Sequence, residues 1–262
     1  MGKFDGIMIA SDWDNTLFCN GKIPDANLKA IKYFQDNGGL FTACSGRYYG
    51  FLKSYMNVLN FNTYLITYNG AMIVSPDGNE CLYCGFCDEY LFSLLDEIVK
   101  SGIKFENIRF FIDSDDFLIK LDNATEYEEA KSNLKTKNVF KAVIVYENEE
   151  DAVFNRNMLY DKNILHDYLA VRSWGAGLEI IKKDNSKGVA VRRVADAVGA
   201  HLLITAGDFE NDIELIKAAD IGYAVGNAVD ELKSIADRIT IPCSEGAIAR
   251  IIYDIESELD KL

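Results

Sequence analysis

Apolar and polar positions follow a repeating order along the first third of the chain. Short apolar runs predict buried strands at residues 6–11, 40–44 and 64–68. Apolar residues at helical spacing predict helices at residues 25–37 and 48–58, and a pair of glycines ends the first of them. Strands that alternate with helices in this way are typical of a parallel sheet that is covered on both faces.

The same order returns in the last third of the chain. A helix face that includes Val191 and Val194 ends at Gly199, and an apolar strand follows at residues 202–206. A closing helix is predicted from apolar residues at helical spacing, namely Ile248, Ile251, Ile252, Ile255 and Leu259. The sequence therefore predicts an α/β fold whose core is a Rossmann-like parallel sheet built from both ends of the chain.

The middle of the chain has a different pattern, which begins with a turn signal at residues 75–78. Strands are predicted at residues 109–112, 117–121, 140–146, 168–173 and 178–181, and helices near residues 124–134 and 149–160. We therefore expect an inserted α+β domain at residues 84–182, while residues 1–83 and 183–262 form the core.

The composition favours a folded enzyme over a nucleic-acid-binding protein. Of the 262 residues, 49% are hydrophobic and 26% are charged, which is enough apolar material for one large or two modest cores. The formal net charge is -14, so the chain as a whole has no electrostatic attraction for nucleic acid. An anionic substrate must therefore find positive charge locally.

The chain carries no signal for a membrane or for secretion. No apolar run reaches the roughly 18 to 20 residues of a membrane span, and residues 1–14 lack a basic segment before an apolar core. Cys81 and Cys84 share a C-x-x-C spacing, but in a strand this spacing points them to opposite faces. Ordinary buried or half-buried thiols are favoured over a metal centre. We expect a cytoplasmic protein without a membrane or obligate protein partner.

Two carboxylates follow the first predicted strand directly, in the run Asp12, Trp13, Asp14, Asn15, Thr16. The carboxyl ends of strands are where open α/β sheets bind ligands. Covalent phosphoryl transfer needs one carboxylate that attacks phosphorus and a second that moves protons. This pair alone is equally compatible with a solvated acidic turn.

Other strand ends add matching groups. Ser45, Gly46 and Arg47 follow the second strand and offer a hydroxyl and main-chain N–H groups to phosphate oxygens, although Ser45 alone fits a helix cap. Lys187 opens a core helix, where a lysine opposes the helix dipole unless an anion lies nearby. A lone lysine is also compatible with a solvated position.

The last segment is Gly207, Asp208, Phe209, Glu210, Asn211, Asp212, at another strand-to-helix turn. Carboxylate oxygens here and at Asp12 are the hard ligands that suit Mg²⁺ together with waters and a phosphate oxygen. An acidic helix start that is stabilised by the dipole explains Glu210 but not the coincidence of the four segments.

Taken in order, D-x-D-x-T, S-G-R, S-K-G and G-D-x-x-N-D resemble the motifs of the haloacid dehalogenase superfamily. The runs at residues 68–71 and 226–228, and an insertion of roughly 100 residues between the second and third motifs, are similar to its Cof-type phosphatases. The resemblance implies that Asp12 is the nucleophile and that Asp14 is the general acid and base. It also implies that Ser45 and Lys187 bind phosphate.

Further roles are implied by the same resemblance. Magnesium would lie on Asp12, Asp208 and the main-chain carbonyl of Asp14, with Asp212 beside the metal or holding the lysine. Asn211 would orient the phosphate or Lys187, and Asn69 and Arg47 lie where substrate and phosphate approach. The family usually has glycine where this chain has Asn15, and asparagine tolerates a positive φ better than most residues.

The predicted function is a magnesium-dependent phosphatase that acts on a small phosphorylated metabolite, such as a sugar phosphate or a phosphorylated cofactor, through an aspartyl phosphate. The inserted domain would close over the site and set specificity. Two alternatives remain open at the level of sequence. One is a sugar phosphomutase of the same superfamily, and the other is a protein that binds phosphate without turnover.

Overall fold

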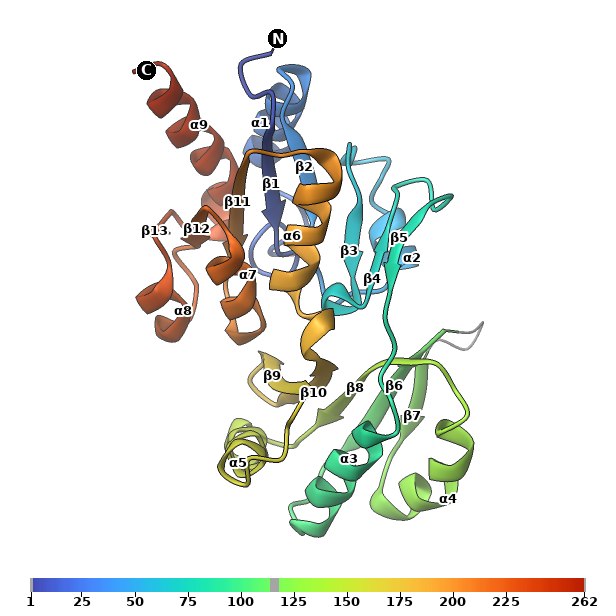
Figure 1. The fold of residues 1–262 in the computed structure, drawn as a ribbon. Coiled ribbons are helices and arrows are strands. Elements are labelled where there is room, and N and C mark those ends of the chain that lie inside the picture. Colours follow the sequence, from blue (N-terminus) through green and yellow to red (C-terminus); the bar gives the residue numbers. More distant parts are fainter. Residues whose placement is uncertain (1, 114–117, 262) are drawn as a thin grey trace. The chain divides into compact units, whose positions relative to one another are not determined.

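The computed structural model describes residues 2–113 and 118–261. The chain divides into two compact units (Figure 1). Met1–Tyr83 and Ser186–Leu262 form the core unit, and Cys84–Asn185 form the insert unit. In the described ranges, no helix combines the length and the apolar character that crossing a membrane requires.

The core unit is built on a parallel sheet with strand order β13-β12-β11-β1-β2. Its strands are β1 Ile7–Ser11, β2 Leu40–Ala43, β11 Leu202–Gly207, β12 Ile221–Ala224 and β13 Arg238–Ile239. Every residue of β1 is buried, because helices cover both faces of the sheet. Beside β2, a parallel bridge from Cys44 to Ile66 leads to a smaller sheet of β3 Leu65–Thr67, β4 Met72–Val74 and β5 Cys81–Cys84.

Two layers of helices enclose the central sheet (Figure 1). The helices of the core unit are α1 Asp25–Asp36, α2 Tyr49–Lys53, α6 Lys187–Val198, α7 Ile213–Ala218, α8 Asp230–Ile235 and α9 Ala247–Leu259. Successive residues of a strand point to opposite faces, so Ile9 packs with α1 and α9 while Met8 packs with α6 and α7. The alternation of strands and helices in the sequence thus produces two apolar layers around one sheet.

The insert unit has an antiparallel sheet with strand order β7-β6-β8-β10-β9. Its elements are α3 Tyr90–Lys100, β6 Asn107–Ile112, β7 Leu118–Leu121, α4 Ala124–Leu134, β8 Val139–Val145, α5 Glu149–Asp161, β9 Tyr168–Trp174 and β10 Gly177–Lys182. Alternate strand residues, such as Ile108 and Phe110, join the helices in a separate apolar core. The predicted α/β class, with a parallel core and an α+β insert, is confirmed.

Several local predictions were wrong. The helix expected at residues 48–58 ends at Lys53, and beyond it the main-chain N–H groups of Tyr55 and Met56 donate to carbonyls three residues back, so the chain continues as turns. Helix α3 was not predicted, although Oδ1 of Asp88 accepts from the main-chain N–H of its first residue, Tyr90, at 3.0 Å and its buried residues recur at helical spacing. For the predicted strand 117–121, Phe117 lies outside the described residues. Cys81 and Cys84 are exposed rather than buried or half-buried.

Candidate active site

Three segments of the candidate site leave the carboxyl ends of neighbouring parallel strands. Asp12 follows β1, Ser45 lies just beyond β2, and Asp208 follows β11. Asp12 is buried, and its main-chain N–H donates to the Ala206 carbonyl at 2.9 Å, which continues the pairing of β1 with β11. The parallel sheet therefore brings together groups that are far apart in the sequence.

Lys187 is the first residue of α6, directly after the N-cap residue Ser186. Its side chain is fully buried, and Nζ lies 2.6 Å from Oδ1 of Asp12 and 2.6 Å from Oδ1 of Asp212. The anion expected beside this helix start is thus supplied by two carboxylates of the protein. A solvated lysine, the alternative reading of this position, is wrong.

The turn after β11 fixes Asp208 and Asp212 relative to each other. Oδ2 of Asp212 accepts from the main-chain N–H groups of Asp208 at 2.9 Å and Phe209 at 3.3 Å. Gly207 is required here, because a Cβ at this position would come within 2.5 Å of the Asp212 Cβ. Oδ1 of Asp208 in turn accepts from the Thr16 hydroxyl at 3.2 Å, which ties the turn to the segment after β1.

The buried centre holds more negative than positive charge. Asp12, Asp208 and Asp212 each place a carboxylate oxygen within 4.8 Å of the others, and Lys187 is the cation bonded to this group. Burial, reinforced by the charge of Asp212, raises the pKa of Asp12 to about 7 although Lys187 opposes the shift. Burial and the neighbouring carboxylates raise the pKa of Asp208 to about 9. Both raised pKa values reflect the surplus of carboxylates over ammonium groups in this cluster.

The Lys187 ammonium keeps its proton in this environment. Burial disfavours the charged form, but the charges of Asp12 and Asp212 outweigh it and raise the pKa of Lys187 well above its ordinary value. Lys187 is therefore a fixed positive charge at the centre of the site.

Asp14 has surroundings unlike those of Asp12. Its side chain is 46% exposed and accepts two hydrogen bonds from Arg47, from Nε to Oδ2 and from Nη2 to Oδ1, both at 2.9 Å. The Arg47 guanidinium also lies over the Phe51 ring, 4.7 Å from its centroid. The two carboxylates of the D-x-D motif are thus held separately, one by a buried lysine and one by a surface arginine.

Asn15 has φ = 59°, so the positive φ considered for this position is present. The turn that contains it is closed by hydrogen bonds from Asn15 N to Phe18 O and from Phe18 N to Trp13 O, both at 2.8 Å. Trp13 is buried, and its ring stacks on that of Phe18. The segment after Asp12 is consequently an anchored turn.

Ser45 is buried, and its hydroxyl oxygen accepts from the main-chain N–H of Arg47 at 3.1 Å, across the bend at Gly46. It is not the cap of α2, whose N-cap residue is Tyr48, so the helix-cap alternative is wrong. The Ser45 carbonyl accepts from the main-chain N–H of Asn69 at 2.9 Å, and Asn69 has a φ of 61°. The segments around Ser45 and Asn69 are therefore adjacent.

Asn211 does not hold the lysine. It is half-buried in the turn before α7, and within residues 2–113 and 118–261 no hydrogen bond links its side chain to Lys187. Asp212 makes that contact instead. The sequence also gave no role to Asn227, whose amide donates to the Asn15 carbonyl at 2.9 Å. Its position in the G-N-A run was the available signal.

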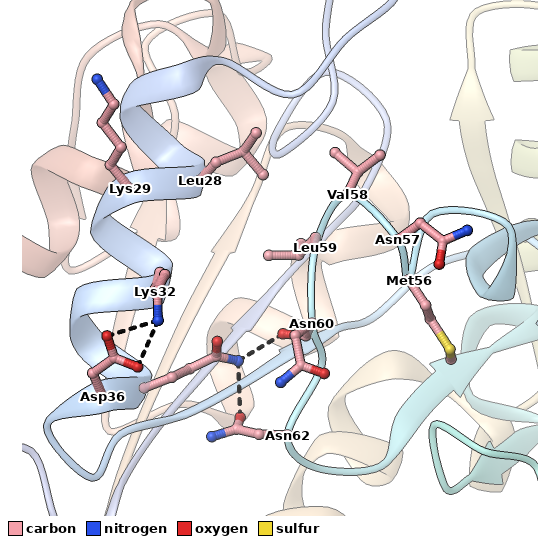
Figure 2. A pocket seen from close by; sticks show the side chains of 11 residues that line it. Leu28, Lys29, Lys32, Asp36, Met56, Asn57, Val58, Leu59, Asn60 and Asn62 are labelled. Carbon is pink, nitrogen blue, oxygen red and sulfur yellow. Dashed lines mark hydrogen bonds and ion pairs between the residues drawn. The ribbon is translucent and has the colours of Figure 1, made fainter.

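A surface groove of about 620 Å³ lies elsewhere on the core unit, between α1 and the segment 56–62 (Figure 2). Lys32 pairs with Asp36 at its wall (Figure 2). Gln35 donates to the Asn60 carbonyl at 2.7 Å. None of the candidate site residues lines this groove. The groove and the buried carboxylate cluster are therefore made of different residues.

A model of the haloacid dehalogenase-like hydrolases matches residues 9–252. Among curated proteins, a phosphatase of Bacillus subtilis (strain 168), YitU, is 27% identical over 268 residues, which cover 94% of this chain and 96% of the relative. Its name gives 5-amino-6-(5-phospho-D-ribitylamino)uracil as the substrate. The putative phosphatase YxeH of the same organism is 26% identical over 270 residues, which cover 95% of this chain and 97% of the relative.

Solved structures share the fold. A haloacid dehalogenase-like hydrolase from B. subtilis superposes with a TM-score of 0.78 at 21% identity, over 94% of this chain and 98% of the other. The subclass IIB sugar phosphatase BT4131 superposes with a TM-score of 0.74 at 18% identity, over 95% of this chain and 98% of the other. Both similarities extend over the core unit and the insert unit together.

Proposed function

Because the chain belongs to the haloacid dehalogenase-like hydrolases and is a phosphatase of their Cof type, we propose that it hydrolyses a small phosphorylated metabolite through a phosphoryl group carried by Asp12. One observation supports this proposal above the others. The buried Asp12 carboxylate is held by Lys187 at the carboxyl end of the central sheet, with a second carboxylate, Asp14, two residues further along the chain.

Asp12 acts as the nucleophile, and Asp14 acts as the general acid and base. In the first step a carboxylate oxygen of Asp12 attacks phosphorus, the bond to the leaving oxygen breaks, and Asp14 donates a proton to that oxygen. In the second step Asp14 takes a proton from water, the water oxygen attacks phosphorus, and inorganic phosphate leaves the regenerated Asp12 carboxylate. Arg47 donates to both Asp14 oxygens in this structure, so one of these bonds opens while Asp14 carries the proton and the other keeps the carboxyl group oriented.

The phosphoryl oxygens are bound by groups that surround Asp12. Lys187 contributes a fixed positive charge, and Ser45 and Gly46 contribute the hydroxyl and main-chain N–H groups after β2. Asn211 lies at the opposite turn, after β11, where its amide contacts the phosphate. Arg47 and Asn69 lie at the approach to the phosphate and contact the substrate.

The donor set suits Mg²⁺, because three carboxylates face one ammonium and their oxygens are hard ligands. Asp12, Asp208 and the main-chain carbonyl of Asp14 would hold the ion, with Asp212 beside it and engaged with Lys187. When bound, Mg²⁺ neutralises charge on the phosphoryl oxygens. Removal of divalent cations by a chelator should abolish turnover, and added Mg²⁺ should restore it.

The names of the relatives support a substrate class. YitU is named for a phosphorylated ribityl compound and BT4131 for sugar phosphates, so a phosphorylated sugar or a cofactor-like metabolite is the proposed substrate. Residues 84–182 form the domain that contacts the part of the substrate beyond the phosphate and sets specificity. Release of phosphate from a panel of such metabolites, with and without Mg²⁺, would identify the class.

Asp12→Asn tests the nucleophile. We expect turnover of a chromogenic phosphate ester to fall on the order of 10⁴-fold, because the amide cannot form the covalent intermediate. Asp36→Asn, at the exposed pair with Lys32 in Figure 2, is the control and should keep full activity. Undiminished turnover by Asp12→Asn would contradict the assignment. Phosphate release in proportion to substrate consumed supports hydrolysis, whereas an isomeric sugar phosphate without free phosphate identifies a mutase.

A further inference from the structure

The loop at residues 225–229, after β12, carries none of the groups assigned to the reaction, yet it is bonded to the end of β11. The main-chain N–H of Val225 donates to the Gly207 carbonyl at 3.1 Å. The main-chain N–H of Val229 donates to the carbonyl of Asp208 itself at 2.9 Å. This loop is therefore built onto one side of the carboxylate cluster.

Within this loop, the Asn227 side chain joins two other segments. Its Nδ2 donates to the Asn15 carbonyl at 2.9 Å, and its Oδ1 accepts from the main-chain N–H of Cys243 at 2.8 Å. Asn15 directly follows Asp14 and has a left-handed backbone. The amide thus fastens the residue beside Asp14 to a loop that is itself fastened to Asp208.

These contacts form a closed circuit. From Asn15 it passes through Asn227 and along the chain to Val229, then through the Asp208 carbonyl to the Asp208 carboxylate. It returns through the Thr16 hydroxyl, which donates to Oδ1 of Asp208 at 3.2 Å. Because Asn15 and Thr16 are consecutive, the circuit defines where the turn after Asp12 stands relative to Asp208.

We propose that Asn227 is a positioning residue for the reaction. By holding the Asn15 carbonyl, it fixes Asp14 at the distance from Asp12 and Asp208 that both proton transfers require. Without this bond the turn retains its internal hydrogen bonds and the Thr16 contact with Asp208, but it loses its hold on the loop at residues 225–229. The inference rests on the proposed function, because turnover is one of its readouts.

Asn62 provides a matched control within the same unit. Its Oδ1 accepts from the main-chain N–H of Phe41 at 2.8 Å, and its Nδ2 donates to the Gly39 carbonyl at 2.9 Å. Both asparagines are exposed and each joins one main-chain donor to one main-chain acceptor. Asn62 acts at the amino end of β2, however, which is the end of the strand opposite to the candidate site.

The experiment compares Asn227→Ala with Asn62→Ala. We expect kcat to fall about tenfold or more in Asn227→Ala with KM changed by less than about threefold, as for groups that orient catalytic residues. Asn62→Ala should keep kcat within about twofold at a similar loss of thermal stability. Equal kcat in the two variants would overturn the proposal.

Hydrogen exchange, read by mass spectrometry without substrate, supplies a measurement independent of turnover. Peptides that cover residues 12–23 should exchange faster in Asn227→Ala than in Asn62→Ala, and equal exchange would overturn the tether. If the wild-type protein releases no phosphate from any ester, the proposed function fails. The exchange result still shows whether Asn227 holds the turn after Asp12. Asn227→Asp keeps the acceptor for Cys243 but lacks the donor to Asn15, so it should reproduce both effects if Asn227→Ala does not fold.

Discussion

Each of the two units buries a lysine against a carboxylate, and the two clusters differ in their balance of charge. In the insert unit, Lys141 of β8 lies 2.6 Å from Glu179 of β10, and each side chain is 3% exposed. The other carboxylate oxygen of Glu179 accepts from the Ser173 hydroxyl. In the core unit, Lys187 lies 2.6 Å from both Asp12 and Asp212.

The comparison separates a structural ion pair from a reactive one. Lys141 and Glu179 neutralise each other across neighbouring strands, and such a pair mainly avoids the cost of burying a single charge. Around Lys187, by contrast, three carboxylates share one ammonium, and the pKa values of Asp12 and Asp208 rise. Burial alone therefore does not mark a functional lysine, whereas burial with surplus negative charge does.

Among the variants compared in this section, Lys187→Met should lower turnover the most. We expect kcat to fall on the order of a thousandfold, because a fixed charge on the phosphoryl oxygens is lost in a site shielded from water. Steady-state turnover of the preferred phosphate ester measures this effect. Lys141→Met, assayed on folded protein, is the control and should retain most activity; comparable losses of turnover would remove the distinction between the clusters.

Lys141→Met should instead lower stability. Removing Lys141 takes away the ammonium that lies 2.6 Å from the buried Glu179 carboxylate, so the free energy of unfolding should fall by about 3 kcal/mol. Lys141→Met combined with Glu179→Met should recover most of that loss, since both charges are then gone. Urea unfolding of the insert unit within the full chain measures both changes, and a double variant as unstable as the single one would contradict a balanced pair.

The surplus charge also predicts how pH acts on the protein without metal. The pKa values of about 7 for Asp12 and about 9 for Asp208 lie above those of unfolded carboxyls, so the folded state binds these protons more tightly. Their contribution to stability is present at low pH and is lost as pH rises through about 7 and about 9. Mg²⁺ should therefore raise the thermal midpoint more at about pH 9 than at about pH 6, and a shift independent of pH would argue against these ligands.

The smallest expected effect concerns the surface arginine. Arg47→Lys removes the paired hydrogen bonds to Asp14 and should lower kcat by about three- to tenfold, with little change in stability because the pair is half exposed. Arg238→Lys is a close control, since Arg238 pairs with Glu258 at similar exposure and lies over the Tyr223 ring. If both variants keep full kcat, Arg47 does not orient Asp14.

The positions of the strand ends could be predicted from the sequence, whereas the side-chain contacts between the segments that follow them could not. The resemblance to the haloacid dehalogenase superfamily is confirmed by the match over residues 9–252. Asp12, Ser45 and Asp208 could be placed at the carboxyl ends of strands because apolar strands are local signals. Helix α3 was missed although Asp88 accepts from its first main-chain N–H, and α2 was predicted too long because apolar spacing does not show where main-chain bonding changes after Lys53.

Side-chain partners could not be inferred in the same way. The choice of Asp212 rather than Asn211 as the partner of Lys187 depends on how the turn after β11 folds around Gly207. The pairing of Arg47 with Asp14 and the bond from Asn227 to Asn15 join segments whose approach is set by the packing of the whole sheet. Such contacts leave no periodic trace in a single sequence.

The strand order has a consequence for the synthesis of the chain. β1 lies between β2 and β11, so Ile9 pairs with Phe41 early in the sequence but with Ile204 only after the whole insert unit has been made. The insert unit is one continuous segment with its own apolar core. On the ribosome we therefore expect Cys84–Asn185 to fold before the core unit is complete. Until β11 has been synthesised, β1 can pair only with β2.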